Sequence, residues 1–165
     1  SIVNDISGLT FDGAMACVAA ERGAGVVLMH IQGTPETMQR DPRYADLVGE
    51  ICAFLAAAAE RALAGGVGRE KIIVDPGIGF GKTLEDNYRI IKNLHGIKKL
   101  GFPVLVGLSR KSLIGKLYGS DADRLPATIA LNAASVLNGA DIIRVHDVKE
   151  HRLALDGLEM LKRIS

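Results

Sequence analysis

Short apolar runs alternate with longer amphipathic segments along the whole chain. Five of the short runs are rich in β-branched or other apolar residues and predict strands at 2–6, 25–30, 71–75, 102–109 and 140–147. The segments between them predict helices at 14–22, 41–63, 83–100, 112–118 and 126–137, and a last helix that begins at residue 149. A strand followed by a helix, five times over, indicates an α/β fold with a parallel sheet.

Local signals place the ends of several of these helices. Asp41 followed by Pro42 is typical of an N-cap with proline in the first turn, and Gly65-Gly66 ends the same helix. Thr83 with Asp86 resembles a capping box at the start of the next one.

Two architectures fit the pattern. The strands are apolar almost throughout, so both faces of the sheet are expected to be covered. An open doubly wound sheet satisfies this, and so does part of a (β/α)8 barrel, which needs about 250 residues when complete. The chain has 165 residues and no linker or internal repeat, so residues 1–165 are predicted to be one domain or part of one.

Composition narrows the class of protein. Lys and Arg number 20 against 19 Asp and Glu, without a run of like charge, which argues against a nucleic-acid or membrane-surface partner. Apolar runs are too short to span a bilayer. Cys17 and Cys52 form no CxxC pair and are interpreted as reduced core thiols of a cytoplasmic protein.

The stretch DPGIGFGKT, residues 75–83, resembles two nucleotide loops and matches neither. A P-loop requires glycine where Pro76 stands. A GxGxxG fingerprint requires its third glycine where Lys82 stands. The three alternating glycines allow positive φ, or the close approach of a flat ligand to the backbone.

Polar side chains follow every predicted strand, at the edge where ligands bind in both architectures. They are Asn4 and Asp5, His30 and Gln32, Asp75, the run Ser109-Arg110-Lys111-Ser112, and Arg144, His146 and Asp147. Five convergent polar ends are a stronger signal of a site than any one of them.

Arg144 and His146 stand two positions apart on a strand, so their side chains point to the same face. A guanidinium beside an imidazole suits a polyanion such as pyrophosphate. The alternative is a salt bridge from Arg144 to a neighbouring carboxylate, with His146 half-buried. Lys111, from another strand end, favours the anion site.

Asp75 offers two acceptor oxygens to a ligand with adjacent N–H donors, and Asn4 can both donate and accept. The alternatives are a loop cap for Asp75 and a turn residue for Asn4. Phe80 faces either a ligand or the core.

The remaining polar residues suggest no other chemistry. His30 is interpreted as a core histidine, and His95 and His151 as solvated helix positions. We find neither metal-ligand spacing nor a nucleophile paired with a base. The expected site recognises and polarises its ligand.

Taken together, these residues make the chain resemble the dihydropteroate synthases of folate biosynthesis. The matching motifs, in the family's order, are VNDISG (3–8), LMHIQGTPETMQ (28–39), IIVDPGIGFGKT (72–83), GLSRKSLIG (107–115) and IIRVHDV (142–148). The resemblance implies a TIM barrel of the pterin-binding type. It also implies an enzyme that joins 6-hydroxymethyl-7,8-dihydropterin diphosphate to p-aminobenzoate, releases pyrophosphate, and is a sulfonamide target.

The resemblance also implies roles for particular residues. Asn4, Asp75 and Lys111 would hydrogen-bond the pterin. Ile6, Met29 and Phe80 would line the pocket, and Ser112 would lie near p-aminobenzoate. Arg144 would stack on the pterin and, with His146, hold the diphosphate. Lys111, Arg144 and His146 are thereby the expected catalytic residues.

The family's N-terminal part, with its Mg²⁺-holding Asn and closing loops, is not found among these motifs. We therefore expect an incomplete barrel of about five βα units, the C-terminal portion of a single domain, with no metal ligand of its own for the implied Mg²⁺. By itself this piece is expected to be inactive. The resemblance further implies a homodimer and a cytoplasmic location.

Two alternatives stay open. A different pterin-binding barrel, such as a methyltetrahydrofolate methyltransferase domain, would share the pterin residues without needing the cation cluster, so a pyrophosphate binding test separates the two. A non-catalytic half-barrel that serves as an interaction module would have no pterin affinity.

Overall fold

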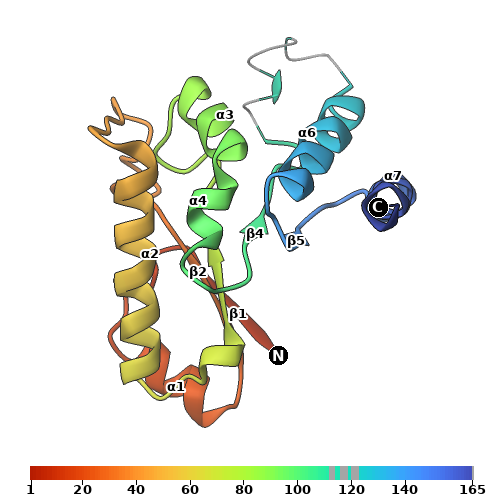
Figure 1. Ribbon diagram of the computed structural model, residues 1–165. Coiled ribbons are helices and arrows are strands. Elements are labelled where there is room, and N and C mark those ends of the chain that lie inside the picture. The colour runs from red at the N-terminus through yellow and green to blue at the C-terminus, as the bar shows by residue number, and fades with distance from the viewer. Residues whose placement is uncertain (112–113, 116–118, 120–122, 165) are drawn as a thin grey trace.

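The computed structural model describes residues 1–111, 114–115, 119 and 123–164, and strands alternate with helices through this part of the chain (Figure 1). The strands are β1 (Ile2–Asp5), β2 (Gly25–Met29), β3 (Ile72–Asp75), β4 (Leu105–Val106) and β5 (Ile142–Ile143). The helices are α1 (Met15–Glu21), α2 (Leu47–Ala64), α3 (Leu84–Lys92), α4 (Leu94–Lys98), α6 (Leu125–Leu137) and α7 (Val148–Arg163), with a 3-10 turn η1 at Arg69–Lys71. The predicted helix at 112–118 lies mostly outside the described residues.

Each strand lies beside its neighbours in sequence, and all pairs are parallel. β1, β2 and β3 form one sheet in that order, and β4 pairs with β5. A parallel bridge between Val74 and Val104 joins the two groups. These pairings confirm the predicted α/β fold with parallel strands.

The two faces of the sheet have different surroundings. Every second strand residue packs into one apolar core with the helices, among them Val26, Leu28, Ile72 and Val74. The alternate residues, such as Asn4, Val27, Met29 and Asp75, are not part of this core. Because side chains alternate across a strand, these residues share the opposite face of the sheet.

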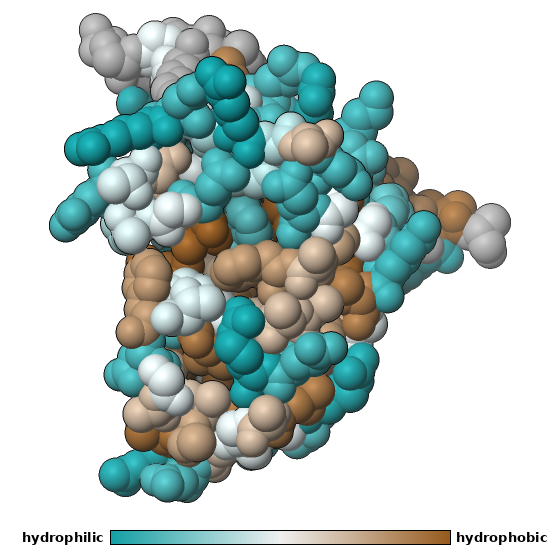
Figure 2. All heavy atoms as spheres, turned by 90° about the vertical axis from the view of Figure 1, so that its left-hand side faces the viewer, coloured by the Kyte–Doolittle hydropathy of each residue, from teal (hydrophilic) through white to brown (hydrophobic). Residues whose placement is uncertain are grey.

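The helix side of the core is built mainly by α2 and by the pair α3 and α4. Ile51, Leu55 and Ala58 of α2 are fully buried, as are Ile90 of α3 and Leu94 of α4. The outward positions of α2 include Ala53 and Ala64, and Figure 2, which looks onto this side, shows a band of apolar surface between polar zones.

The start of α2 corrects one sequence prediction. The helix begins at Leu47 with Asp46 as its N-cap, and the Asp46 carboxylate accepts from the backbone N–H of Gly49. The carboxylate of Glu50 reaches back to the N–H of Asp46. Asp41 has a φ of +56° and belongs to a loop. Two better placed acidic side chains therefore outcompete the Asp-Pro signal.

The other element predictions hold with shifted bounds; α6 and α7 each begin one residue earlier than predicted. The Thr83–Asp86 capping box is present, but the helix predicted over 83–100 breaks at Asn93, whose side-chain amide donates to the Arg89 carbonyl. The strands expected at 102–109 and 140–147 shrink to two residues each. Their remaining residues form the loops that carry polar side chains.

Two side-chain expectations were wrong. The core interpretation fails for Cys17, which is exposed on α1, whereas Cys52 is half-buried and packs against the core; both are free thiols. His151 on α7 is only 2% exposed, and its ring Nδ1 lies 2.7 Å from the carbonyl oxygen of Asp147, the N-cap of that helix. His95 is exposed as expected. Within the described residues, we find no helix that is both long and apolar enough to cross a membrane.

Candidate functional site

The loop 75–82 leads from the end of β3 to α3 and is held by side chains from several elements. Four consecutive carbonyl groups each accept a hydrogen bond from a different side chain. The donors are Lys111 to Ile78, Gln39 to Gly79 (2.8 Å), Lys82 to Phe80 (2.8 Å) and Tyr44 to Gly81 (2.6 Å). Such a loop is fixed before any ligand arrives.

The amides of the same loop are used internally. The N–H of Gly77 donates to Asp75 Oδ1 at 2.7 Å, that of Gly79 to Asn87 Oδ1 at 2.7 Å, and that of Phe80 to the Gly77 carbonyl at 3.0 Å. A nucleotide loop needs such N–H groups free to bind phosphate oxygens. With the N–H groups of Gly77, Gly79 and Phe80 already engaged, the loop differs from a P-loop, in agreement with the failed motif matches.

Gly77 is required by the way the loop packs on β2. Its φ is +70°, and a Cβ there would lie 1.9 Å from the carbonyl oxygen of His30. No side chain fits at that distance. The glycine brings the loop backbone against the end of β2 and so fixes where Asp75 stands.

Asp75 is the buried carboxylate of the site, with 6% of its surface exposed. Its Oδ1 caps the loop through Gly77, as one sequence alternative proposed. Among the described residues, we find no hydrogen bond to Oδ2. The loop-cap interpretation of Asp75 is therefore confirmed for Oδ1, and a role of this carboxylate in ligand binding stays a prediction.

Three cations surround this carboxylate. Burial raises the pKa of Asp75, and the Gly77 N–H, Lys111, Lys82 and Arg144 oppose that rise. Burial lowers the pKa of Lys111 to about 8, although the negative charge of Asp75 raises it. One negative charge among three positive ones leaves a site that favours an anion.

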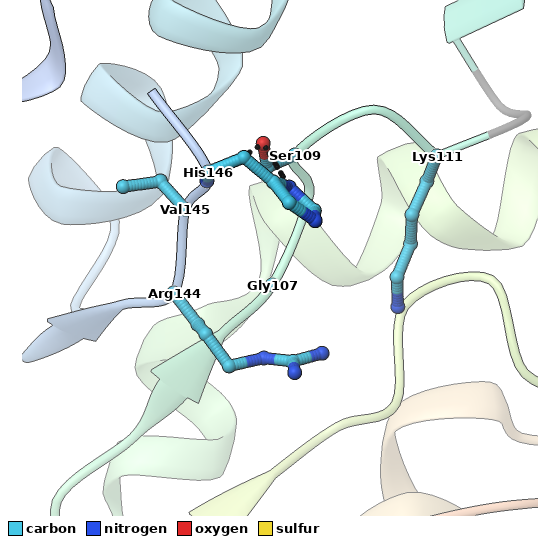
Figure 3. Close-up of a pocket in the computed structure, with 6 residues that line it drawn as sticks. All are labelled: Gly107, Ser109, Lys111, Arg144, Val145 and His146. Atoms are coloured by element: carbon cyan, nitrogen blue, oxygen red, sulfur yellow. Dashed lines mark hydrogen bonds between the residues drawn. The ribbon is translucent and has the colours of Figure 1, made fainter. Parts of the chain in front are cut away.

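Lys111, Arg144 and His146 meet around a cavity of about 90 Å³ that Gly107, Ser109 and Val145 also line. Figure 3 shows the Arg144 guanidinium, the Lys111 ammonium and the His146 ring directed toward the same space, while Val145 points away from it. Ser109 Oγ accepts the backbone N–H of His146 (3.2 Å) and lies 2.9 Å from its ring Nδ1. The serine therefore fixes the histidine ring.

The neighbouring carboxylate does not neutralise Arg144. Asp147 pairs instead with Arg110, at 2.7 Å between the guanidinium and the carboxylate. Within the described part of the chain, Arg144 forms no salt bridge. Its side chain runs along Gly107, where a Cβ would lie 3.5 Å from Nε. The structure thus favours the anion site over the salt-bridge alternative for this arginine.

The other predicted site residues are distributed around Asp75. Asn4 is exposed on the same sheet face, two strands away. Met29 is buried and pairs in register with Asp75. The Phe80 ring lies 4.5 Å from Lys111 Nζ, a cation–π distance. Ile6 is half-buried just after β1. Ser112 lies outside the described residues.

Sequence reasoning missed two features of the site, the burial of Lys82 and the contact of Ser109 with His146. Lys82 is 2% exposed, and its ammonium lies 2.9 Å from His30 Nδ1. A lysine between glycine and threonine is typical of an exposed loop, so no local signal marks it as buried. His30 is buried, as expected, and burial followed by the charge of Lys82 lowers its pKa to about 3.

The site does not provide a set of ligands for Mg²⁺. Across the residues that the structure describes, no three His, Cys, Asp or Glu side chains come together. The groups around the cavity are mainly cationic, whereas Mg²⁺ prefers carboxylate oxygens and water. This part of the chain alone therefore does not fit a resident metal.

The comparisons with known proteins agree with this geometry. A sequence model of the family described as "Pterin binding enzyme" matches residues 1–146. Dihydropteroate synthase of Synechocystis sp. is 48% identical over 150 residues, which are 90% of this chain and 52% of that protein. The chain spans about half the length of the curated relatives it matches.

Solved structures are similar over nearly the whole chain. Dihydropteroate synthase from Thermus thermophilus, in complex with 6HMPPP, superposes with a TM-score of 0.91 at 44% identity, over 98% of this chain and 64% of that one. The same enzyme in complex with 4-aminobenzoate gives 0.90, over 98% and 66%. The Yersinia pestis enzyme in a sulfonamide complex gives 0.94 at 39% identity, over 99% and 60%. By the match to residues 1–146, the chain belongs to the pterin binding enzyme family, and these relatives within it are dihydropteroate synthases.

Proposed function

We propose that this chain carries the pterin and diphosphate sites of a dihydropteroate synthase. The reaction would join 6-hydroxymethyl-7,8-dihydropterin diphosphate to p-aminobenzoate and release pyrophosphate. One observation supports this above all others. The buried carboxylate of Asp75 interacts with the charges of Lys111 and Arg144, and these two cations line a cavity together with His146.

The residues suggest how the chain would act on these substrates. Asp75 and Asn4 would accept and donate hydrogen bonds along the pterin edge, and Lys111 would add a donor. Met29, Ile6 and Phe80 would supply apolar walls, and Ser112 would face p-aminobenzoate. The complexes of the Thermus thermophilus enzyme with 6HMPPP and with 4-aminobenzoate support these ligand classes.

The chemistry needs charge stabilisation and no nucleophile from the protein. The bond between the pterin methylene carbon and the diphosphate oxygen breaks, and the oxygen keeps the electron pair. The p-aminobenzoate nitrogen forms the new bond to that carbon and loses a proton. Arg144, His146 and Lys111 would stabilise the negative charge that develops on the leaving group. Mg²⁺, which the family resemblance implies, would add positive charge there when bound.

The order of the strands supports a barrel rather than a doubly wound sheet. In a doubly wound sheet the strand order reverses at a switch point. Here β1, β2 and β3 are consecutive, and the Val74–Val104 bridge leads on to β4 and β5. We propose that the chain is the C-terminal five βα units of a TIM barrel of the pterin-binding type. A homodimer and a cytoplasmic location stay predictions.

An activity assay tests the proposed reaction. The 165-residue chain is incubated with both substrates and Mg²⁺, alone and with the N-terminal part of a related dihydropteroate synthase added in trans. We expect pyrophosphate release only when both parts are present, because β1 leaves Ile2 65% exposed at an open sheet edge. Turnover by the chain alone would contradict the expected inactivity of this piece. Absence of turnover in both mixtures, although the chain binds the pterin, would contradict the proposed reaction.

A further inference from the structure

Lys82 occupies a place in the fold that neither the pterin nor the diphosphate assignment uses. Its side chain is almost fully buried below the loop 75–82, where a charged group is costly unless it is paired. The ammonium donates to the Phe80 carbonyl at 2.8 Å and lies 2.9 Å from His30 Nδ1. We therefore looked for an interaction in the neighbouring site that stabilises the buried ammonium.

His30 is the common anchor for both ends of this loop. Its backbone N–H donates to the Asp75 carbonyl at 2.9 Å, where the loop begins. Its ring meets Lys82, where the loop closes. The ring is neutral near pH 7, because burial and Lys82 lower the pKa of His30 to about 3, so Nδ1 accepts a hydrogen bond from the ammonium. Phe54 packs against that ring edge-on, with 4.9 Å between centroids.

The charged groups around Lys82 come from three elements. Asp75 at the end of β3 and Asp86 on α3 favour the ammonium form, whereas Lys111 after β4 disfavours it. Burial is the largest influence and lowers the pKa of Lys82 to about 7. In turn Lys82, with Lys111 and Arg144, opposes the rise that burial causes in the pKa of Asp75. The lysine and the carboxylate therefore stabilise each other's charged form.

We propose that Lys82 is a positioning residue for the pterin site, whose ammonium keeps Asp75 ionised and ties the Phe80 end of the loop to His30. This rests on the proposed function, because Asp75 is there the pterin acceptor. In this proposal Lys82 does not contact the ligand. It acts through the charge of Asp75 and through the loop backbone.

The coupling can be measured on the unaltered chain. Protonation of Lys82 that favours pterin binding must, by linkage, be favoured by bound pterin in return. The titration of the lysine Nζ resonances is followed by NMR with and without saturating 6-hydroxymethylpterin. We expect the buried Lys82 resonance to titrate at a higher pH when the pterin is bound. An unchanged titration in a chain that demonstrably binds pterin would refute the proposal.

Variants give a second and independent test. Lys82→Met removes the charge and both hydrogen bonds, and Lys82→Gln removes the charge but keeps a donor for Phe80. Lys92→Met, at an exposed position on α3, is the matched control. Losing one nearby cation disfavours the ionised form of a carboxyl group, so pterin affinity should fall in both Lys82 variants, and it should fall most at low pH.

The pH profile separates this role from a purely structural one. The loss of affinity should shrink as the pH rises, because Asp75 ionises more fully and because Lys82 of the unaltered chain itself loses its charge above its pKa of about 7. A loss that is the same at pH 6 and pH 9 would contradict the electrostatic role, and unchanged affinity in a folded variant would contradict any role. If the unaltered chain binds no pterin at all, the proposed function itself is wrong. The binding isotherm of the unaltered chain distinguishes this outcome from a failure of the Lys82 proposal.

Discussion

At the scale of single residues, the site depends on a carboxylate with two separate tasks. One oxygen of Asp75 caps its own loop through Gly77, and the other, which accepts no hydrogen bond among the described residues, is proposed to bind the pterin; three cations interact with the carboxylate. The sequence alone offered these two roles as alternatives. The structure shows the cap and leaves the second oxygen open, because a single N–H occupies only one side of a carboxylate.

Asp75→Asn separates these two tasks. The asparagine oxygen can still accept the Gly77 N–H. Its amide nitrogen, however, would place an N–H donor opposite the N–H donor of the ligand. An unpaired buried polar group costs about 1–3 kcal/mol, so we expect pterin affinity to fall about 5- to 150-fold while the melting temperature changes little. Asp12→Asn is the control, because its carboxylate caps Ala14 in the same manner in an exposed loop. Lower stability with unchanged pterin affinity would make Asp75 a structural cap only.

Arg144→Ala tests the anion site. The guanidinium has no salt bridge among the described residues and faces the cavity, so it is expected to bind a diphosphate directly. A charge-assisted contact contributes about 1.5–3 kcal/mol, so calorimetry should find pyrophosphate binding about 10- to 100-fold weaker. Arg152→Ala removes the same charge from an exposed pair with Asp156 on α7 and should have little effect. If the Arg144→Ala and Arg152→Ala variants bound pyrophosphate equally well, the anion would have to bind at a site that does not include Arg144.

Lys111 gives the anion site a pH dependence. Its pKa is lowered to about 8, chiefly by burial, so the ammonium loses its proton in a range where free lysines stay charged. Pyrophosphate affinity should therefore decline as the pH rises above that value. In Lys111→Met the affinity should be lower at pH 7, and this decline should be absent. The ionisation of pyrophosphate itself affects both proteins alike, so the difference between their profiles isolates the lysine. Parallel profiles would exclude Lys111 from the site.

At the scale of elements, the loop 75–82 determines the geometry of the site. Its carbonyls are bound by side chains from the β2–α2 connection, from the loop after β4 and from Lys82 itself. The sequence predicted the loop, its place at a strand end and the capping box that follows it. It could not predict which side chains close over the loop, because Gln39, Tyr44 and Lys111 are far away along the chain. The buried state of Lys82 also follows only from this tertiary closure.

Gly77→Ala tests how closely the loop must approach β2. Alanine in a left-handed conformation costs about 1–2 kcal/mol by itself, and the Cβ would in addition meet the His30 carbonyl. Urea unfolding should show a loss of at least that size, together with weaker pterin binding. Gly13→Ala is the matched control, since no atom lies within 4 Å of its Cβ position. A stability loss confined to Gly13→Ala, or absent from both variants, would contradict the packing described.

At the scale of the whole molecule, the sequence predicted the fold class, the strand positions and the residue types at the strand ends. The order of strands and helices follows from local patterns, which is why it was predictable. The start of α2 at Leu47 and the break at Asn93 were not, because competing side-chain caps decide them. The choice between barrel and open sheet depends on strand order, and strand order is a property of pairing across the chain.

The most direct test of the proposed site is a calorimetric titration of the 165-residue chain with 6-hydroxymethyl-7,8-dihydropterin diphosphate. The ligand joins the two groups that Asp75 and Arg144 are proposed to bind. We expect one binding site per chain, from which either free pterin or pyrophosphate displaces the ligand, because each competes for one part of the same site. A chain that is folded by circular dichroism and yet binds no ligand, or a ligand that neither competitor displaces, would contradict the proposed site.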